Sequence, residues 1–131
     1  MSNISQNDVA VFYDEFAKKQ KKTGLNLRHY KSFHLIKKFG LKRHHTVLEV
    51  GCGIGTFTIL LKNYLRAGSI LATDISPTNI NEAKNLLKHK KNVDFLVTDM
   101  TSFEVNKKFD FIVMLDVLEH IPIENHFNLF K

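Results

Sequence analysis

From Thr46 onward, short apolar segments alternate with amphipathic ones, and this alternation is the feature that most limits the fold. The apolar segments are residues 46–50 (TVLEV), 69–74 (SILATD), 93–99 (VDFLVTD) and 109–115 (FDFIVML). Each is short and nearly all apolar, which is typical of strands in a parallel sheet that is covered on both faces. Residues 56–65 and 79–90 have the periodicity of crossover helices. The pattern predicts one α/β domain of the doubly wound, Rossmann-like kind.

Two amphipathic helices are predicted before this core. The first follows a candidate cap, Asp8, and has apolar residues at helical spacing: Val9, Phe12, Tyr13 and Phe16. The second ends at Gly40 and rests on the spacing of Leu27, Tyr30, His34 and Phe39. Later in the chain, Ser76 and Pro77 mark the start of a crossover helix. We expect residues 1–40 to form a helical lid and residues 41–131 to form the core.

Composition limits the class of protein and its partners. The chain has 131 residues, 44% hydrophobic and 24% charged, which suits one soluble domain. It has neither an apolar run near the roughly 18 residues of a membrane span nor a signal peptide, and its single cysteine agrees with a reducing compartment. A cytoplasmic location without membrane contact is therefore predicted. The formal charge of +6 is spread over four clusters, residues 18–22, 37–43, 88–91 and 107–108. Because such a spread is typical of solvated surface, no nucleic-acid partner is predicted.

Acidic residues stand at the carboxyl ends of all four predicted strands. Glu49 precedes the glycine turn GCGIG, and the later strands end at Asp74, Asp99 and Asp116. Ligands of doubly wound sheets bind at this edge. The turn has the spacing G-x-G-x-G rather than the G-x-G-x-x-G of a dinucleotide site, and a carboxylate is poorly placed beside a pyrophosphate. These features indicate a ligand with positive charge.

Four motifs follow one another at fitting intervals: LEVGCGIG, ATDIS, VTDM and FDFIVMLDVLEHIP. Together, from Val47 to about Pro122, they closely resemble the class I S-adenosylmethionine-dependent methyltransferases. The resemblance implies a Rossmann-like methyltransferase fold with strand order 3-2-1-4 and S-adenosylmethionine as the cofactor. It also implies transfer of a methyl group to a small-molecule acceptor.

The resemblance implies that the glycine turn binds the methionine part of the cofactor. Gly51, Gly53 and Gly55 would let the backbone approach it, because side chains would collide there. Glu49 would neutralise the cofactor's ammonium group or hold the shape of the loop. Cys52 belongs to the predicted cofactor-binding residues, as a side chain that fills a small gap in the turn.

The later strand ends are assigned to the nucleoside part. By resemblance, Asp74 would accept hydrogen bonds from the two ribose hydroxyls, and Asp99 would accept from the exocyclic amine of adenine. Met100 would meet the ring. Ile75 and Leu115 are the candidate walls of the pocket.

Two further candidates lie at the ends of the chain. Tyr13, in the FYDEFA run, resembles a tyrosine that reaches the cofactor's carboxylate or closes the pocket. His120 is the candidate general base, with a structural histidine as the alternative. If their segment is helical, His120 shares a face with Asp116 and Glu119, as metal ligands can. This segment resembles the one that follows the fourth strand in the O-methyltransferases of ubiquinone biosynthesis, some of which use a divalent cation. Here the first carboxylate is Asp116 rather than glutamate, and the shorter side chain reaches less far, so no metal is predicted.

The complete fold of this family has seven strands, and only four are found in this sequence. We therefore expect the fourth strand, FDFIVML, to lie at an edge and to favour self-association. Either the chain is the N-terminal part of a longer enzyme or a dimer covers the edge. Three alternative functions stay open: a cofactor-binding or interaction module without its own catalysis, an RNA-directed methyltransferase, and, least favoured, a dehydrogenase.

Overall fold

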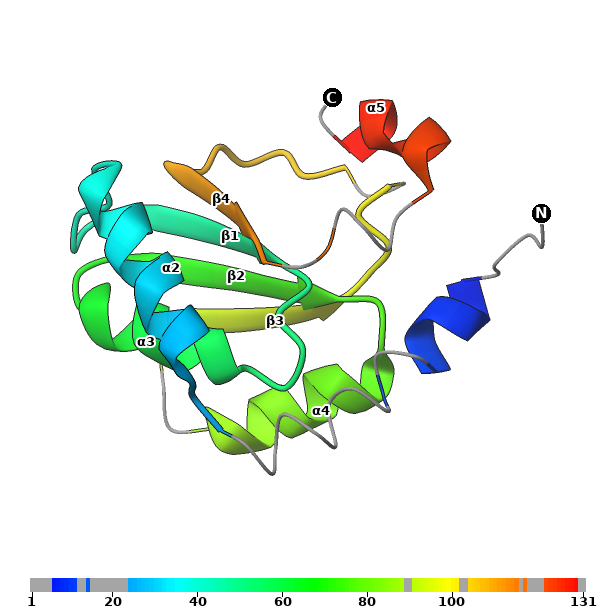
Figure 1. The fold of residues 1–131 in the computed structure, drawn as a ribbon, viewed down its shortest axis with the longest axis horizontal. Coiled ribbons are helices and arrows are strands. Elements are labelled where there is room, and N and C mark those ends of the chain that lie inside the picture. Colours follow the sequence, from blue (N-terminus) through cyan, green and yellow to red (C-terminus); the bar gives the residue numbers. More distant parts are fainter. Residues whose placement is uncertain are drawn as a thin grey trace.

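The computed structural model describes residues 6–11, 14, 24–88, 91–101, 104–115, 117 and 122–129. Residues 6–11 are helical. After them come α2 (Leu27–Lys38), β1 (Thr46–Val50), α3 (Thr56–Tyr64), β2 (Ser69–Asp74), α4 (Pro77–Leu86), β3 (Val93–Val97), β4 (Phe111–Met114), the 3-10 helix η2 (Ile123–Asn125) and α5 (His126–Leu129) (Figure 1). None of the helices within these ranges is long and apolar enough to cross a membrane.

The four strands form one parallel sheet in the order β3-β2-β1-β4, as the sequence predicts (Figure 1). Glu49 of β1 is in register with Ala72 of β2 on one side and with Val113 of β4 on the other. Because all four strands run the same way, their carboxyl ends meet at one edge of the sheet. The turns that precede them meet at the opposite edge.

The helices α2, α3 and α4 cover one face of the sheet and form the main core with it. This core contains fully buried residues of the strands and of α3, among them Val47, Leu61 and Ile70, and Phe33 and Ile36 of α2 pack against it. The other face has a smaller cluster that draws only on strand and loop residues, with Leu48, Val50 and Val117 at its centre.

The two faces are therefore covered unequally. On the second face, where no described helix contributes to the cluster, Ile112 of β4 is 59% exposed and Leu96 of β3 is 36% exposed. The prediction of a sheet covered on both faces is confirmed for β1, whose last four residues are all buried. It is wrong for the two edge strands in the described part of the chain, because Ile112 and Leu96 stay exposed on their second face.

The helix ends follow the capping rules at two of the three predicted places. Ser76 accepts the N–H of Asn79 at the start of α4, where Pro77 is the first residue, as predicted. The backbone of Gly40, with φ of +108°, ends the α2 segment as expected. Asp8, however, is not a cap, because the helical run already includes Gln6.

The apolar spacing that predicts α2 does not mark its packed face. Leu27 and Phe39 are 69% and 74% exposed, whereas Phe33 and Ile36 pack against the core. The helix is thus predicted correctly from residues that do not hold it in place.

Candidate functional site

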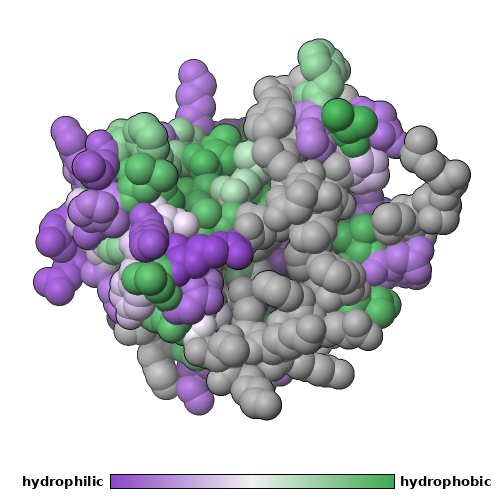
Figure 2. Space-filling model, viewed as in Figure 1, coloured by the Kyte–Doolittle hydropathy of each residue, from purple (hydrophilic) through white to green (hydrophobic). Residues whose placement is uncertain are grey.

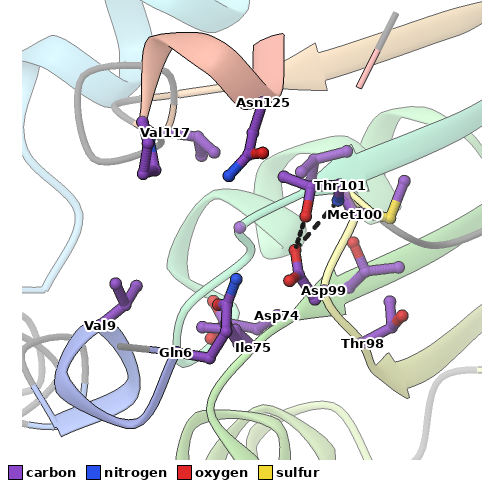
Figure 3. A pocket seen from close by; sticks show the side chains of 14 residues that line it. Gln6, Val9, Asp74, Ile75, Thr98, Asp99, Met100, Thr101, Val117 and Asn125 are labelled. Carbon is purple, nitrogen blue, oxygen red and sulfur yellow. Dashed lines mark hydrogen bonds between the residues drawn. The ribbon is translucent and has the colours of Figure 1, made fainter. Parts of the chain in front are cut away.

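A pocket lies where β1, β2 and β3 end (Figure 3). Its empty space amounts to about 690 Å³, which includes the part open to solvent. The described residues that line it are Gln6, Val9, Val50, Gly51, Thr73, Asp74, Ile75, Thr98, Asp99, Met100, Thr101, Val117, Pro122 and Asn125. Segments from both ends of the chain therefore wall a site that the strand ends build.

The charge of this lining is purely acidic. Asp74 and Asp99 are its charged residues, and no lysine, arginine or histidine occurs among the described lining residues. Both side chains appear in the lower part of the pocket, beneath Asn125 and Val117 (Figure 3). The pocket is therefore suited to a ligand that is cationic or rich in hydrogen-bond donors.

Asp74 is held by three hydrogen bonds at the end of β2. Its Oδ1 accepts the backbone N–H of Ser76 at 2.9 Å and the side-chain amide of Asn79 at 3.3 Å. Its Oδ2 accepts the N–H of Gly53 at 2.9 Å. The glycine turn after β1 is thus tied directly to the carboxylate at the end of β2.

These bonds limit what Asp74 can do for a ligand. A carboxylate offers about four acceptor positions, two on each oxygen, and three are used here, which leaves one on Oδ2. Asp74 can accept one hydroxyl directly, and a second would have to displace the long bond from Asn79. Burial raises the pKa of Asp74, the three donors oppose this shift, and the nearby carboxylate of Asp14 adds to it.

Asp99 follows β3 and shapes its own turn. Its Oδ1 accepts the N–H of Thr101 at 3.0 Å and the Thr101 hydroxyl at 2.8 Å (Figure 3). Met100, between them, is half-buried and packs against the small core cluster. Asp99 and Met100 therefore line the pocket together, at the place where an adenine was predicted.

The glycine turn has the left-handed backbone that side chains rarely adopt. Gly51, Gly53 and Gly55 have φ of +73°, +57° and +90°. Gly51 lines the pocket, and a Cβ there would collide with the side chain of Val117. Gly55 begins α3 and packs near Ala83 of α4. Gly53 and Gly55 are not among the lining residues, so their predicted contact with a cofactor stays a prediction.

Glu49 is buried beside the site rather than in its wall. Its Oε2 accepts the hydroxyl of Thr58 in α3 at 2.6 Å, and its backbone carbonyl accepts the Thr73 hydroxyl at 3.2 Å. Burial raises the pKa of Glu49 to about 8; the Thr58 bond lowers it and the charge of Asp74 raises it further. These contacts favour the second predicted role of Glu49, to hold the shape of the loop.

Cys52 and Leu115 are also packed away from the lining. The Cys52 thiol lies 3.5 Å from the carbonyl of Gly53, and burial followed by the charges of Glu49 and Asp74 raises its pKa well above the usual value. Leu115 packs against the main core. Ile75, by contrast, lines the pocket, and its contact with a cofactor stays a prediction.

Four predicted residues lie outside the described part of the chain: Tyr13, Asp116, Glu119 and His120. Their roles stay predictions. Among the described residues, no group of three His, Cys, Asp or Glu side chains could hold a metal ion.

Several lining residues escape sequence reasoning. Thr73, Thr98 and Thr101 lie next to the predicted acidic residues, so their position at the strand ends was a usable signal. Gln6 and Asn125 come from segments far away in the sequence, and nothing local points to them. Asp14 does not line the pocket but was missed for the same reason; it accepts a hydrogen bond from the Ser76 hydroxyl at the start of α4.

Comparison with known sequences identifies the family. Residues 47–131 match the model of a methyltransferase domain. The malonyl-[acyl-carrier protein] O-methyltransferase 1 of Ilyobacter polytropus is 33% identical over 103 residues, which is 79% of this chain and 36% of that protein. Phosphoethanolamine N-methyltransferase 3 of Arabidopsis thaliana is 44% identical over 61 residues, 47% of this chain and 12% of that protein. The chain thus spans about a third or less of the length of these curated relatives.

Solved structures agree with the sequence match. Magnesium protoporphyrin IX methyltransferase from Synechocystis, with bound SAH, matches this chain with a TM-score of 0.73 at 20% identity. The match covers 95% of this chain and 64% of that one, and it shows a similar fold. The N-methyltransferase NodS of Bradyrhizobium japonicum, in complex with S-adenosylhomocysteine, has a TM-score of 0.69 at 25% identity, covering 78% of this chain and 50% of that one. With the domain match over residues 47–131, the chain belongs to the class I S-adenosylmethionine-dependent methyltransferases.

Proposed function

We propose that this chain binds S-adenosylmethionine in the pocket at the strand ends and serves the transfer of its methyl group to a small-molecule acceptor. The bound cofactor would supply an electrophilic methyl group on a positively charged sulfur. The chain's residues would bind and orient it and keep water from it, because the gain from a near-attack geometry depends on fixed positions.

The observation that carries the proposal is the charge of the pocket. Asp74 and Asp99 face the same space as Gly51, and no described lining residue is basic. A cofactor with a sulfonium, an ammonium and several hydrogen-bond donors suits such a lining. The pyrophosphate of a nicotinamide dinucleotide would meet two carboxylates without a cation to offset them, which disfavours the dehydrogenase alternative.

The contacts of the site support a division of labour. Asp74 has one acceptor position left, which suits a ribose hydroxyl, and Asp99 would accept from the exocyclic amine of adenine. The backbone of Gly51 would face the methionine part, and Ile75, Met100 and Val117 would supply apolar walls. Glu49 would have an indirect role, because its hydrogen bond with Thr58 would hold the glycine turn in place.

The acceptor is proposed only as a class. Relatives are named for malonyl-[acyl-carrier protein] and phosphoethanolamine, one linked to a protein and the other small. Because the chain spans about a third of the first of these, we propose that it keeps cofactor binding while turnover needs more than the residues seen here. A binding module without catalysis is the alternative, and an RNA-directed enzyme is the third. A cytoplasmic location and self-association through β4 belong to the same set of proposals.

Calorimetry with S-adenosylhomocysteine tests the proposal. We expect saturable binding that the Asp74→Asn variant weakens by about 1 to 3 kcal/mol, the cost of losing a charged acceptor. Asp94→Asn is the matched control, because Asp94 is exposed on β3 and makes the same change of charge. No binding by the wild-type chain, or tighter binding of NAD than of S-adenosylhomocysteine, would refute the proposal. A methyl-transfer assay on the same sample then separates an enzyme from a binding module.

A further inference from the structure

The fold gathers basic residues that are scattered in the sequence. The turns before the four parallel strands lie at the edge opposite the pocket, and each carries exposed cations. We call this set the basic edge: Lys42 and Arg43 before β1, Arg66 before β2, Lys91 before β3, and Lys107 and Lys108 before β4. Hydrophilic side chains crowd the left of the molecule in Figure 2, where Figure 1 places the start of the strands.

Contacts between the turns make the basic edge continuous. The N–H of Ala67 donates to the carbonyl of Arg43 at 3.2 Å, which joins the turns before β1 and β2. The Asn92 side chain donates to the carbonyl of Leu65 at 2.8 Å, which joins those before β2 and β3. Thr46 donates its backbone N–H to Asp110 at 2.7 Å, which joins those before β1 and β4. Four strands at about 4.8 Å spacing place these cations along a line of roughly 15 Å.

The charge of the basic edge is left largely unbalanced. In the described ranges, none of its six cations forms an ion pair. Two carboxylates lie near it, Asp94 and Asp110, and Asp110 is engaged by both the N–H and the hydroxyl of Thr46. A surface that is merely solvated tends to balance both signs of charge, whereas here six cations stand against two carboxylates.

Some of these cations are also held in place. The guanidinium of Arg43 lies 5.0 Å from the centre of the Tyr64 ring, and the ammonium of Lys107 lies 5.4 Å from that of Phe109. The Tyr64 hydroxyl in turn donates to the carbonyl of Leu41 at 2.9 Å. Because stacking on a ring restricts a long side chain, these cations lose less entropy when they bind an anion.

An aromatic ring and a groove accompany the charge. Phe39, between Lys38 and Lys42 in the sequence, is 74% exposed. At the β2 and β3 end, a groove is lined by two carboxamides and three cations, namely Lys62, Asn63, Arg66, Lys91 and Asn92. One exposed ring, two amides and the cations offer stacking, hydrogen bonds and charge.

We propose that the basic edge binds the backbone of a single-stranded nucleic acid, with Phe39 as a stacking platform for a base. Single-strand sites combine a line of cations with exposed aromatic residues in this way. An acidic protein would use the charge but has no need of a ring exposed among lysines. The pocket end, with its two aspartates, would repel a polyanion and so favour the opposite edge. This proposal is independent of the methyltransferase function.

Fluorescence anisotropy with a labelled 20-nucleotide oligouridylate tests the proposal. We expect the double variant Lys42→Glu/Lys108→Glu to weaken binding at least tenfold at about 0.1 M salt. The slope of log K against log salt should also become less steep by roughly 1.4, because each of the two lost phosphate contacts contributes about 0.7. The matched control Arg28→Glu/Lys31→Glu has the same net charge, but its changes lie in the first half of α2. It should weaken binding less than threefold.

Two further measurements keep the test decisive. Phe39→Ala should weaken the oligouridylate at least threefold but leave heparin, a polyanion without bases, unchanged. If a charge variant does not fold, amide shift changes in the wild-type chain should map to the basic edge. Equal losses in both double variants, shift changes elsewhere, or binding to polyglutamate but not to the oligonucleotide would overturn the proposal. Calorimetry with S-adenosylhomocysteine should be unaffected by Lys42→Glu/Lys108→Glu, so the two functions can fail separately.

Discussion

Two buried carboxyl groups, Glu49 and Asp74, show how single residues build this site. Both lie at the carboxyl ends of central strands and are 4% and 3% exposed. Asp74 is satisfied by backbone and amide donors and reaches the pocket, whereas Glu49 has one hydroxyl donor and stays behind it. Acidic side chains at neighbouring strand ends thus line the pocket in one case and brace the loop in the other.

Glu49 should make stability depend on pH. Its pKa is about 8 in the folded chain against 4.5 as a reference, so the folded state holds a proton that the unfolded state releases. The free energy of unfolding should therefore fall as pH rises from about 4.5 to about 8 and then level off. Glu49→Gln removes the titrating group and keeps an oxygen for Thr58. We expect it to flatten this fall and to be more stable than wild type at pH 8, on the order of a few kcal/mol.

Urea unfolding at pH 5, 6.5 and 8 measures this effect. Asp94→Asn, an exposed carboxylate, is the control and should keep the wild-type slope. The raised pKa of Asp74 acts in the same direction, so a part of the slope should survive in Glu49→Gln. A variant as steep as wild type would show that Glu49 is ionised in the folded chain.

Among the elements, the glycine turn and Val117, which follows β4, fit each other closely. Gly51→Ala places a methyl group against Val117 and adds the strain of a positive φ. We expect it to destabilise the fold by about 1 to 3 kcal/mol. Val117→Ala in the same chain makes room, so the double variant should lose less than the sum of the two single losses. Additive losses in denaturant unfolding would show that backbone strain alone, and not this contact, requires glycine.

The N-terminal segment is tied to the start of α4 by the bond from Ser76 to Asp14. Ser76 also donates its N–H to Asp74, so Asp14 acts on the pocket through one residue. Asp14→Ala should speed dissociation of S-adenosylhomocysteine about fivefold, the loss of one hydrogen bond of about 1 kcal/mol. Asp14→Asn keeps an acceptor oxygen and should behave as wild type in stopped-flow measurements. If both variants dissociate equally fast, charge rather than the hydrogen bond is responsible.

Sequence reasoning succeeds for the elements where the signal is local. The strands, the crossover helices, Ser76 and the parallel order all follow from period, capping and the family motif. It fails where contacts between residues far apart in the sequence determine which side chains pack or meet. Phe33 and Ile36, not the residues with the predictive spacing, hold α2 to the core, and the basic edge appears only when parallel strands bring four turns together. The pocket residues Gln6 and Asn125 are missed for the same reason, since folding alone brings them to the pocket that Asp74 lines.

At the scale of the whole molecule, the sheet separates two kinds of chemistry. The carboxyl ends of the strands present aspartates to the pocket, and the opposite edge presents cations. Helices cover one face, whereas the other face keeps exposed apolar residues on both edge strands. The described part of the chain is thus asymmetric in charge from edge to edge and in apolar cover from face to face.

This asymmetry leaves β4 as the place where two copies should meet. It pairs with β1 on one side, and no strand pairs with its other side in the described sheet. Ile112, 59% exposed, adds an apolar side chain to these unpaired backbone groups, so we expect self-association that grows with concentration. Ile112→Lys should shift the chain toward the monomer in light scattering, because lysine on an edge strand opposes pairing. The matched control is Ile123→Lys, since Ile123 in η2 is 81% exposed and receives the same charge. A wild-type chain that stays monomeric, or equal effects of both variants, would show that β4 does not carry the contact.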